Sequence, residues 1–252
     1  MRCQTWVMTA AVVMAAAAPA AAQSDTPALS PVQIAIACAP PPTFAGEPDN
    51  TRHIAGAQNS TPRTVFGSHD LVVLDGGAKD GLQLGQWFFV RRANRFGMSG
   101  PGHGRGAKTL GWLHVVAVND ATAIAQVDHT CGAVIAGDYL EPFVAPAEPA
   151  GLDTTAAAGD PDFDNLGRIV NGSEDRSTFG DGDFALIDRG SEQGITPGQL
   201  VAIYRDLRVA GLPLASVGEA VVISTGGSVA VARITHIRDV VIEGDYVALR
   251  KP

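Results

Sequence analysis

The residues that decide the fold are RTVFGSHD at positions 63–70, because they recur as RSTFGDGD at positions 176–183. A run of further matches keeps the same order along both copies and consists mainly of glycine and aspartate. The matched positions are Asp75 with Asp188, Gly77 with Gly190, Gly81 with Gly194, Arg92 with Arg205, His129 with His236, and Gly137–Tyr139 with Gly244–Tyr246. So many ordered matches indicate an internal duplication, in which one structural unit is built twice.

Short apolar runs separated by glycine, aspartate or asparagine make up each copy. In the first copy they include Leu71–Leu74, Trp87–Val90, Leu113–Val118 and Ala123–Val127. Such runs, bounded by turn residues, predict β-strands, and their short connections favour antiparallel pairing. Small modules of this kind protect their edge strands by closing into barrels. We therefore predict an all-β protein of two tandem small antiparallel β-barrel modules, with about five strands in each.

Proline- and alanine-rich stretches mark the joints between these units. We expect a short lead-in strand before each barrel, at residues 52–56 and 168–172. The predicted division is a signal peptide over residues 1–22, an N-terminal extended segment over 23–62, the first barrel repeat over 63–144, a linker over 145–167 and the second repeat over 168–252.

The N-terminus has the features of a secretory signal. Arg2 supplies a positive start, residues 7–18 are apolar, and Ala20–Ala22 offer the small residues that a signal peptidase requires before Gln23. We expect a periplasmic or secreted protein with no membrane insertion after cleavage, because no later segment reaches the length of a membrane span. The formal net charge of −8 disfavours nucleic acid as a partner.

Two cysteines remain once Cys3 leaves with the signal. We predict a disulfide between Cys38 and Cys131, since exported chains commonly pair their cysteines. It would attach a predicted strand at residues 32–36 to the first module. The alternative is that Cys38 carries a lipid anchor, which we favour less because no long apolar segment directly precedes it.

The most unusual stretch is a basic, glycine-rich loop between residues 91 and 108 of the first repeat. One interpretation is a loop that contacts an anion or a partner, because backbone N–H groups of glycine loops hold anions and loops often carry function. The other is a flexible hairpin connection kept soluble by its charge. The candidate binding residues are Arg91, Arg92, Arg95, His103, Arg105 and Lys108.

Signals for catalysis and metal binding are weak. His129 and His236 recur in both repeats, but we prefer a structural role because no zinc signature surrounds them. Residues 160–171 begin like a calcium loop but lack its glycine and final glutamate. The repeated aspartates, Asp75, Asp138, Asp188 and Asp245, lie beside glycines and are interpreted as turn caps. We predict no cofactor, no metal and no catalytic residues.

The spacing of Asp70, Asp75, Gly77, Gly81 and Gly85, followed by an apolar strand ending in arginine and by Gly-Asp-Tyr, resembles a bacterial envelope repeat. It is similar to the C-terminal barrel of flagellar assembly protein T. It is also similar to the barrel of periplasmic proteins that carry peptidoglycan-binding LysM motifs. The resemblance covers residues 63–143 and 176–250 and implies a periplasmic, non-enzymatic module used in assembly or wall contact.

These observations predict a non-catalytic envelope module that binds a partner protein or a cell-wall polymer such as peptidoglycan. The alternative is an enzyme acting on a glycan or small molecule, with its site between the barrels. Facing carboxylates or clustered histidines in a cleft between the modules would favour the enzyme. An exposed apolar or arginine-rich patch would favour the binding module.

Overall fold

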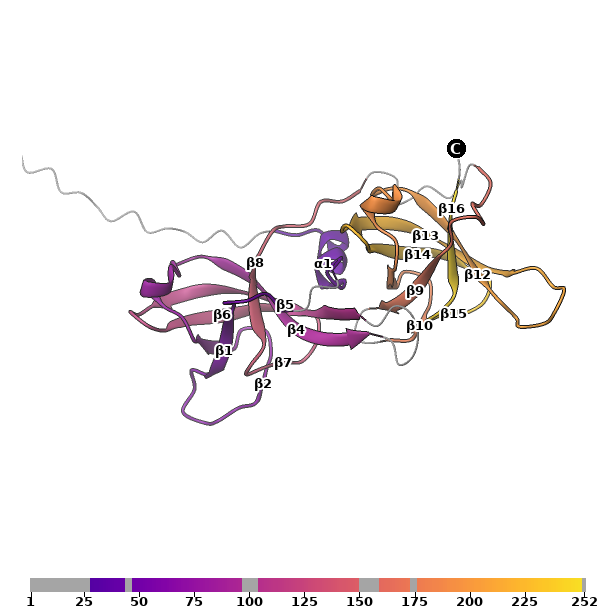
Figure 1. Ribbon diagram of the computed structural model, residues 1–252. Coiled ribbons are helices and arrows are strands. Elements are labelled where there is room, and N and C mark those ends of the chain that lie inside the picture. The colour runs from indigo at the N-terminus through magenta and orange to yellow at the C-terminus, as the bar shows by residue number, and fades with distance from the viewer. Residues whose placement is uncertain (1–27, 44–46, 97–103, 150–158, 173–175, 251–252) are drawn as a thin grey trace, which may run out of the picture.

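The computed structural model describes residues 28–43, 47–96, 104–149, 159–172 and 176–250, and these form two closed antiparallel β-barrels. Figure 1 shows the two barrels next to each other, the first in purple and magenta and the second in orange and yellow. The predicted fold class is therefore confirmed. The expected signal peptide lies outside the described residues.

Barrel 1 closes in the order β1-β3-β6-β5-β4-β8. A two-stranded sheet of β2 and β7 accompanies it. The strands are β1 (Arg52–Ala57), β2 (Val65–Phe66), β3 (Leu71–Leu74), β4 (Trp87–Phe96), β5 (Gly104–Val118), β6 (Ala123–Thr130), β7 (Val134–Ile135) and β8 (Tyr139–Pro142).

Barrel 2 has the same topology, with the strand order β9-β11-β14-β13-β12-β16 and a small sheet of β10 and β15. Each strand therefore has a counterpart in barrel 1, as the duplication predicts. The strands are β9 (Gly167–Gly172), β10 (Thr178–Phe179), β11 (Phe184–Ile187), β12 (Leu200–Arg205), β13 (Ala215–Thr225), β14 (Ala230–Ile237), β15 (Val241–Ile242) and β16 (Tyr246–Leu249).

Each barrel has six strands rather than the expected five, because the predicted lead-in strands are barrel members. β1 pairs with both β3 and β8, and β9 pairs with both β11 and β16. Their buried residues Ile54 and Ile169 belong to the two cores, which explains why these strands close the barrels. The first barrel thus begins at Arg52, inside the stretch that we expected to be an extended segment.

The repeated sequence at positions 63–70 and 176–183 places one aromatic ring in each core. Phe66 and Phe179 are among the largest fully buried side chains. They lie on β2 and β10, the short strands outside the main barrel order, and each ring belongs to the core cluster of its barrel. The repeat is therefore recognisable in sequence because each copy needs the same core contact.

Two matched glycine pairs have clear steric reasons. Gly81 and Gly194 adopt φ angles of 84° and 79°, in the left-handed region that favours glycine. At Gly111 and Gly218, a Cβ atom would approach the carbonyl oxygens of His129 and His236 to 2.0 and 2.4 Å. The close contact of β5 with β6, and of β13 with β14, therefore requires glycine at these positions.

The predicted strand at residues 32–36 is wrong, because these residues belong to helix α1 (Pro31–Cys38). Ser30 caps the helix: its hydroxyl accepts a hydrogen bond from Gln33 N, and the Gln33 side chain accepts one from Ser30 N. Pro31 lies in the first turn, where a backbone N–H has no acceptor within the helix, so its missing N–H costs no hydrogen bond. These start signals outweigh the alternation of β-branched residues that suggested a strand.

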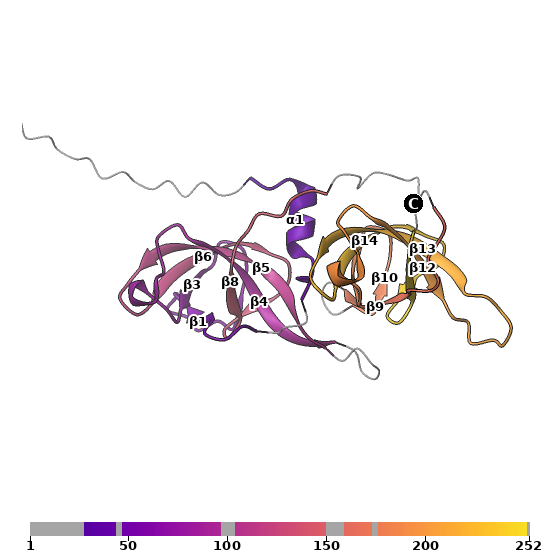
Figure 2. The same cartoon turned by 45° about the horizontal axis from the view of Figure 1, so that its top comes forward.

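Helix α1 lies between the two barrels (Figures 1 and 2). On one side, Ala37 is buried with Phe89 and Trp112 of barrel 1. On the other side, Ile36 and the following Ala39 pack into an apolar cluster on barrel 2 that includes Phe184, Leu186, Val221, Ile223 and Val231. The helix therefore contributes apolar contacts to both barrels.

The predicted disulfide is confirmed, since Cys38 and Cys131 are bonded with their Cα atoms 5.4 Å apart. It joins the last residue of α1 to the residue that follows β6. Among the described residues, no helix is long and apolar enough to cross a membrane.

Candidate functional site

The predicted basic loop is largely a β-hairpin. β4 continues to Phe96 and β5 begins at Gly104, so the segment between residues 91 and 108 is mostly strand. The strand register places Arg92 opposite Lys108 and Arg95 opposite Arg105. His103 lies outside the described residues, as do the side chains of Arg95 and Arg105. The binding role of these positions stays a prediction.

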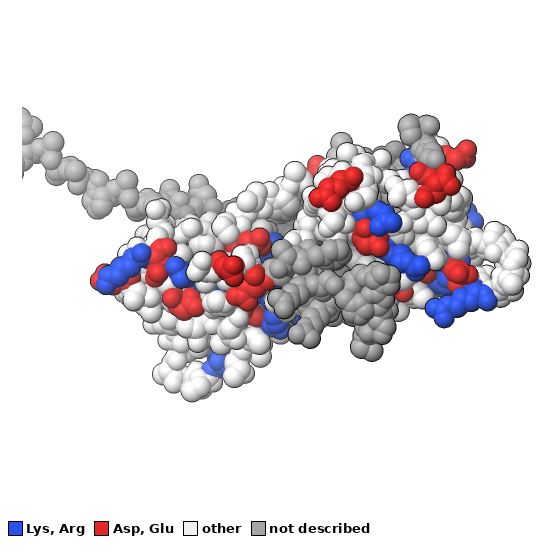
Figure 3. Space-filling view, viewed as in Figure 1, with Lys and Arg blue, Asp and Glu red and all other residues white. Residues whose placement is uncertain are grey.

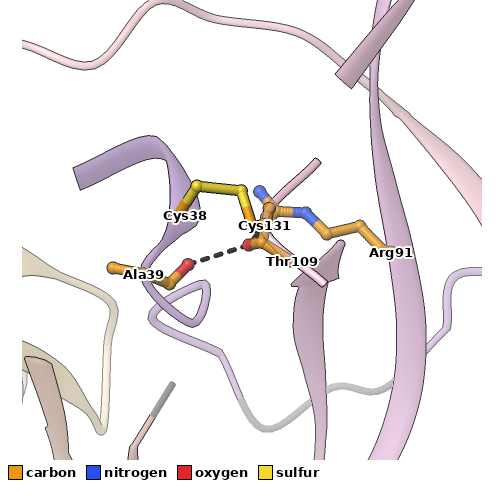
Figure 4. The surroundings of a disulfide bond; sticks show 5 residues. All are labelled: Cys38, Ala39, Arg91, Thr109 and Cys131. Atoms are coloured by element: carbon orange, nitrogen blue, oxygen red, sulfur yellow. Dashed lines mark hydrogen bonds between the residues drawn. A yellow bond between two sulfur atoms is a disulfide. The ribbon is translucent and has the colours of Figure 1, made fainter. Parts of the chain in front are cut away.

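Arg91 has a structural position. Its side chain is 9% exposed, and its Nε atom donates to Glu141 Oε2 at 2.9 Å. Burial lowers the pKa of this guanidinium, against the opposing effect of Glu141. Its Nη1 atom donates to Thr109 Oγ1, and Thr109 in turn donates to the carbonyl oxygen of Ala39 at 2.8 Å, as Figure 4 shows. Arg91 thus helps to hold the segment that follows α1.

Arg92 is also engaged within its barrel. Its Nε and Nη2 atoms donate to the two carboxylate oxygens of Asp138 at 2.6 and 2.9 Å, and Nη2 also donates to the carbonyl of Ala133. In barrel 2, Arg205 makes the same pair of bonds to Asp245, both at 2.8 Å. Hydrogen bonding to Asp245 raises the pKa of Arg205. Because the same pair occurs in both barrels, we assign both arginines a structural role.

Two of the four repeated aspartates, Asp138 and Asp245, have the turn-capping role that we expected, whereas Asp75 and Asp188 bond to a neighbouring strand. Asp138 Oδ2 accepts from Ile135 N at 2.7 Å, and Asp245 Oδ2 accepts from Ile242 N at 2.9 Å. The other two, Asp75 and Asp188, accept from the backbone N–H groups of His53 and Arg168, each at 2.7 Å. All four carboxylates are therefore bonded to backbone groups of their own barrels.

The matched histidines have different surroundings. His129 is half-buried and stacks on Trp112, with ring centroids 4.4 Å apart and an interplanar angle of 16°. His236 is exposed and lies opposite Glu219 in the strand register. A ring nitrogen of His129 also lies within 4.8 Å of the sulfur atoms of Cys38 and Cys131. The spacing His129-x-Cys131 was the sequence signal for this proximity, and our sequence interpretation missed it.

The connection between β12 and β13, residues 206–214, carries the clearest exposed apolar group of the described chain. We call it the β12–β13 tip, and it projects from barrel 2 in Figure 1. Leu207, Val209 and Leu212 are 51%, 55% and 58% exposed. The sequence signal was the presence of large aliphatic residues in a segment with Gly211 and Pro213. Our sequence analysis singled out the charged segment of the first repeat and did not identify this apolar group.

A pocket of about 510 Å³ adjoins the β12–β13 tip and is lined in part by Arg168, Arg205, Arg208 and Tyr246. The Arg168 guanidinium lies 4.1 Å from the centre of the Tyr246 ring, and its Nη2 atom donates to the Tyr246 hydroxyl at 2.7 Å. Within the described part of the chain, the Arg208 side chain has no hydrogen bond or ion pair. Asp206, Glu243 and Asp245 also line the pocket, so three basic and three acidic side chains lie beside the exposed aliphatic residues.

Elsewhere, acidic and basic side chains are interspersed. Figure 3 shows them in small groups on one face, separated by larger uncharged areas. Salt bridges link several of them, for example Arg52 with Asp80 at 3.0 Å and Arg63 with Asp70 at 2.9 Å. Such exposed pairs contribute little to stability, so we assign them no special role.

Comparison with known proteins adds no assignment to this geometry. No protein-family model matches the chain, and no curated protein matches it either. The resemblance to the barrel of flagellar assembly protein T stays a hypothesis that rests on the turn residues.

Proposed function

We propose that this protein is a non-catalytic binding module of the bacterial cell envelope and that it binds a partner protein through the β12–β13 tip. The observation that carries the proposal is the exposure of Leu207, Val209 and Leu212 on one projecting connection. Isolated exposed aliphatic residues are ordinary on protein surfaces, but here three lie within six residues of one projecting connection. Such a group loses its contact with water when a partner covers it.

The charge beside the tip indicates the chemistry of the partner. Arg208 lies within the tip, and Arg168 lines the adjoining pocket. Protein interfaces commonly combine a small apolar centre with arginines that pair with acidic groups at its edge. The proposed partner surface therefore presents an apolar group and a carboxylate that pairs with Arg208, whose side chain has no partner within the described part of the chain.

A protein partner fits this surface better than a cell-wall polymer does. The exposed large hydrophobic residues of the described chain are aliphatic except for Phe163. Phe163 itself contacts Tyr204, with ring centroids 5.0 Å apart. Aliphatic side chains offer no flat face on which a sugar ring could stack.

A pull-down from envelope extracts tests the proposal. A triple variant, Leu207→Ser/Val209→Ser/Leu212→Ser, is compared with the wild-type chain, and isolated peptidoglycan is tested in parallel. The matched control is Val65→Ser/Leu84→Ser in barrel 1, where the two side chains are 55% and 59% exposed.

We expect the tip variant to weaken capture of the partner by about tenfold or more while its melting temperature stays unchanged. The control variant should capture the partner as the wild type does. Equal capture by the tip variant, or binding to peptidoglycan that the tip substitutions leave unaltered, would contradict the proposal.

A further inference from the structure

Three potential metal ligands meet where α1 joins barrel 1. The Sγ atoms of Cys38 and Cys131 and a ring nitrogen of His129 all lie within 4.8 Å of one another. All three residues are half-buried, so the group is partly shielded yet reachable from solvent. Two thiolates and an imidazole are a donor set that thiophilic cations such as Zn²⁺ prefer.

Barrel 1 fixes two of these ligands. His129 lies near the end of β6, and its ring is positioned by the stacking contact with Trp112. Cys131 follows two residues later, and its backbone N–H donates to the carbonyl oxygen of Leu110 at 2.8 Å. The imidazole and one sulfur therefore keep their positions whether or not the disulfide is present.

The third ligand, Cys38, is held near them by contacts that do not depend on the disulfide. Thr109 Oγ1 donates to the carbonyl oxygen of Ala39 at 2.8 Å, and Gln33 Nε2 donates to that of Pro146 at 3.0 Å. The buried Ala37 adds apolar contact with barrel 1. Breaking the disulfide therefore leaves the end of α1 docked beside His129.

The surrounding charge does not oppose a cation. Figure 4 shows the guanidinium of Arg91 directed towards Thr109, next to the disulfide. That guanidinium is paired with Glu141 at 2.9 Å. The positive charge of Arg91 beside the cysteines is therefore compensated by a carboxylate.

We propose that Cys38, His129 and Cys131 form a binding site for a thiophilic divalent cation when the disulfide is reduced. A dithiol reductant delivers two electrons and two protons, so the disulfide becomes two thiols and the reductant becomes a disulfide. The cation then displaces the two thiol protons and binds both thiolates and the neutral imidazole. Three protein ligands leave the fourth position of a tetrahedral ion to water. Disulfide and metal exclude each other.

The internal duplication supplies a matched control. His236 occupies the position of His129 in barrel 2, but it is exposed and faces Glu219 across the strands. No cysteine follows it, since position 238 is Arg238. A site that needs the two cysteines must therefore depend on His129 and be indifferent to His236.

The test uses the full chain, either oxidised or reduced with a phosphine in the absence of oxygen. Zn²⁺ is titrated in competition with a chromophoric chelator, and Co²⁺ serves as a spectroscopic probe. We expect the reduced chain to bind one Zn²⁺ per molecule and to give a thiolate-to-cobalt charge-transfer band. His129→Ala should weaken Zn²⁺ binding by at least about tenfold. The loss of a group that only orients a metal ligand already costs about tenfold, and His129 is itself a ligand. His236→Ala should not weaken it.

Oxidised wild-type protein should bind no Zn²⁺ at this site, and this comparison requires no substitution that could disturb folding. Far-ultraviolet circular dichroism checks that the reduced chain and both variants stay folded. The proposal is overturned if reduced and oxidised wild type bind Zn²⁺ equally, or if His129→Ala binds as the wild type does.

Discussion

Arg92 donates two hydrogen bonds to the carboxylate of Asp138, and the side chain of this aspartate is only 1% exposed. Arg205 and Asp245 repeat the arrangement in barrel 2. A buried carboxylate that loses its partner still bears its desolvation penalty, which no attractive interaction then compensates. The pair therefore has to be treated as part of the barrel, although Arg92 was among our candidate binding residues.

The first prediction is that Arg92→Ala destabilises barrel 1. The substitution leaves Asp138 with only its backbone partner, so the free energy of unfolding should fall by about 2–3 kcal/mol. Urea unfolding followed by circular dichroism measures the change. Arg205→Ala should have a similar effect on barrel 2, and Arg238→Ala, at an exposed position, should have almost none. An unfolding curve for Arg92→Ala that superimposes on the wild type would contradict this view of the pair.

The second prediction concerns the basic hairpin. Because Arg95 lies opposite Arg105 in the register, Arg95→Gln/Arg105→Gln removes two neighbouring charges and leaves Arg92 in place. If the hairpin binds an acidic partner, this variant should bind it more weakly, and the difference should shrink at high salt. Binding is measured at two ionic strengths, with Arg238→Gln as control. Equal binding at low salt would remove the hairpin from the interface.

The third prediction is that the disulfide stabilises the native chain strongly. The bridged residues are separated by 93 positions, and the chain-entropy model gives such a loop about 4–5 kcal/mol. Reduction should therefore lower the melting temperature, whereas thiol titration of the unreduced chain should find Cys38 and Cys131 unreactive even in denaturant. Reactive thiols at both positions before reduction would show that the bond is not formed.

The fourth prediction is a pH dependence from His53. Burial lowers the pKa of this side chain, but hydrogen bonds to Glu47 and Asp75 outweigh the effect and raise its pKa above the usual 6.5. The native state therefore binds the proton more tightly than the unfolded state does. The resulting stability is fully present below about pH 6.5 and is lost as the pH rises through the raised pKa.

All three side chains are about one-third exposed, so we expect less than about 1 kcal/mol from these contacts. His53→Gln should flatten the decline in melting temperature between about pH 6 and 8, relative to wild type, while His236→Gln should preserve it. An unchanged pH profile for His53→Gln would show that another group is responsible.

The fifth prediction concerns a tight contact in barrel 2. A Cβ atom at Gly172 would lie 2.0 Å from Cε1 of the buried Phe179 ring. Gly172→Ala should destabilise barrel 2 by about 1–3 kcal/mol, because the ring has to leave its packed position. Gly56→Ala is the control, since nothing lies within 4 Å of a Cβ atom there. Thermal melts of the two variants measure the difference.

Matched turn residues were sufficient to predict the two barrels and their duplication, because each copy must rebuild the same backbone turns. The disulfide followed from the number of cysteines that lie beyond the predicted signal peptide. Helix α1 was not predictable from alternation, because Ile34 and Ile36 are covered by different barrels and neither faces a sheet partner. That environment depends on segments far away in the chain.

The candidate site was less predictable than the fold. Charge at residues 91–108 suggested one loop, but Arg91 and Arg92 form hydrogen bonds to residues on β5 and around β8. A sequence shows which residues are charged, but not which side chains these residues bind in the folded protein. The β12–β13 tip had a sequence signal in its aliphatic residues beside Gly211 and Pro213, but their exposure became evident only when the structure placed Leu207 and Val209 in a connection.

The position of α1 between the barrels also orders events during folding. The helix precedes both barrels in the chain, but Cys131 and the barrel 2 residues that cover its other side, Phe184 to Val231, lie far downstream. Because domains of a chain generally fold as separate units, part of α1 faces water until both barrels have closed. Helix α1 is therefore among the last described segments to reach its final surroundings.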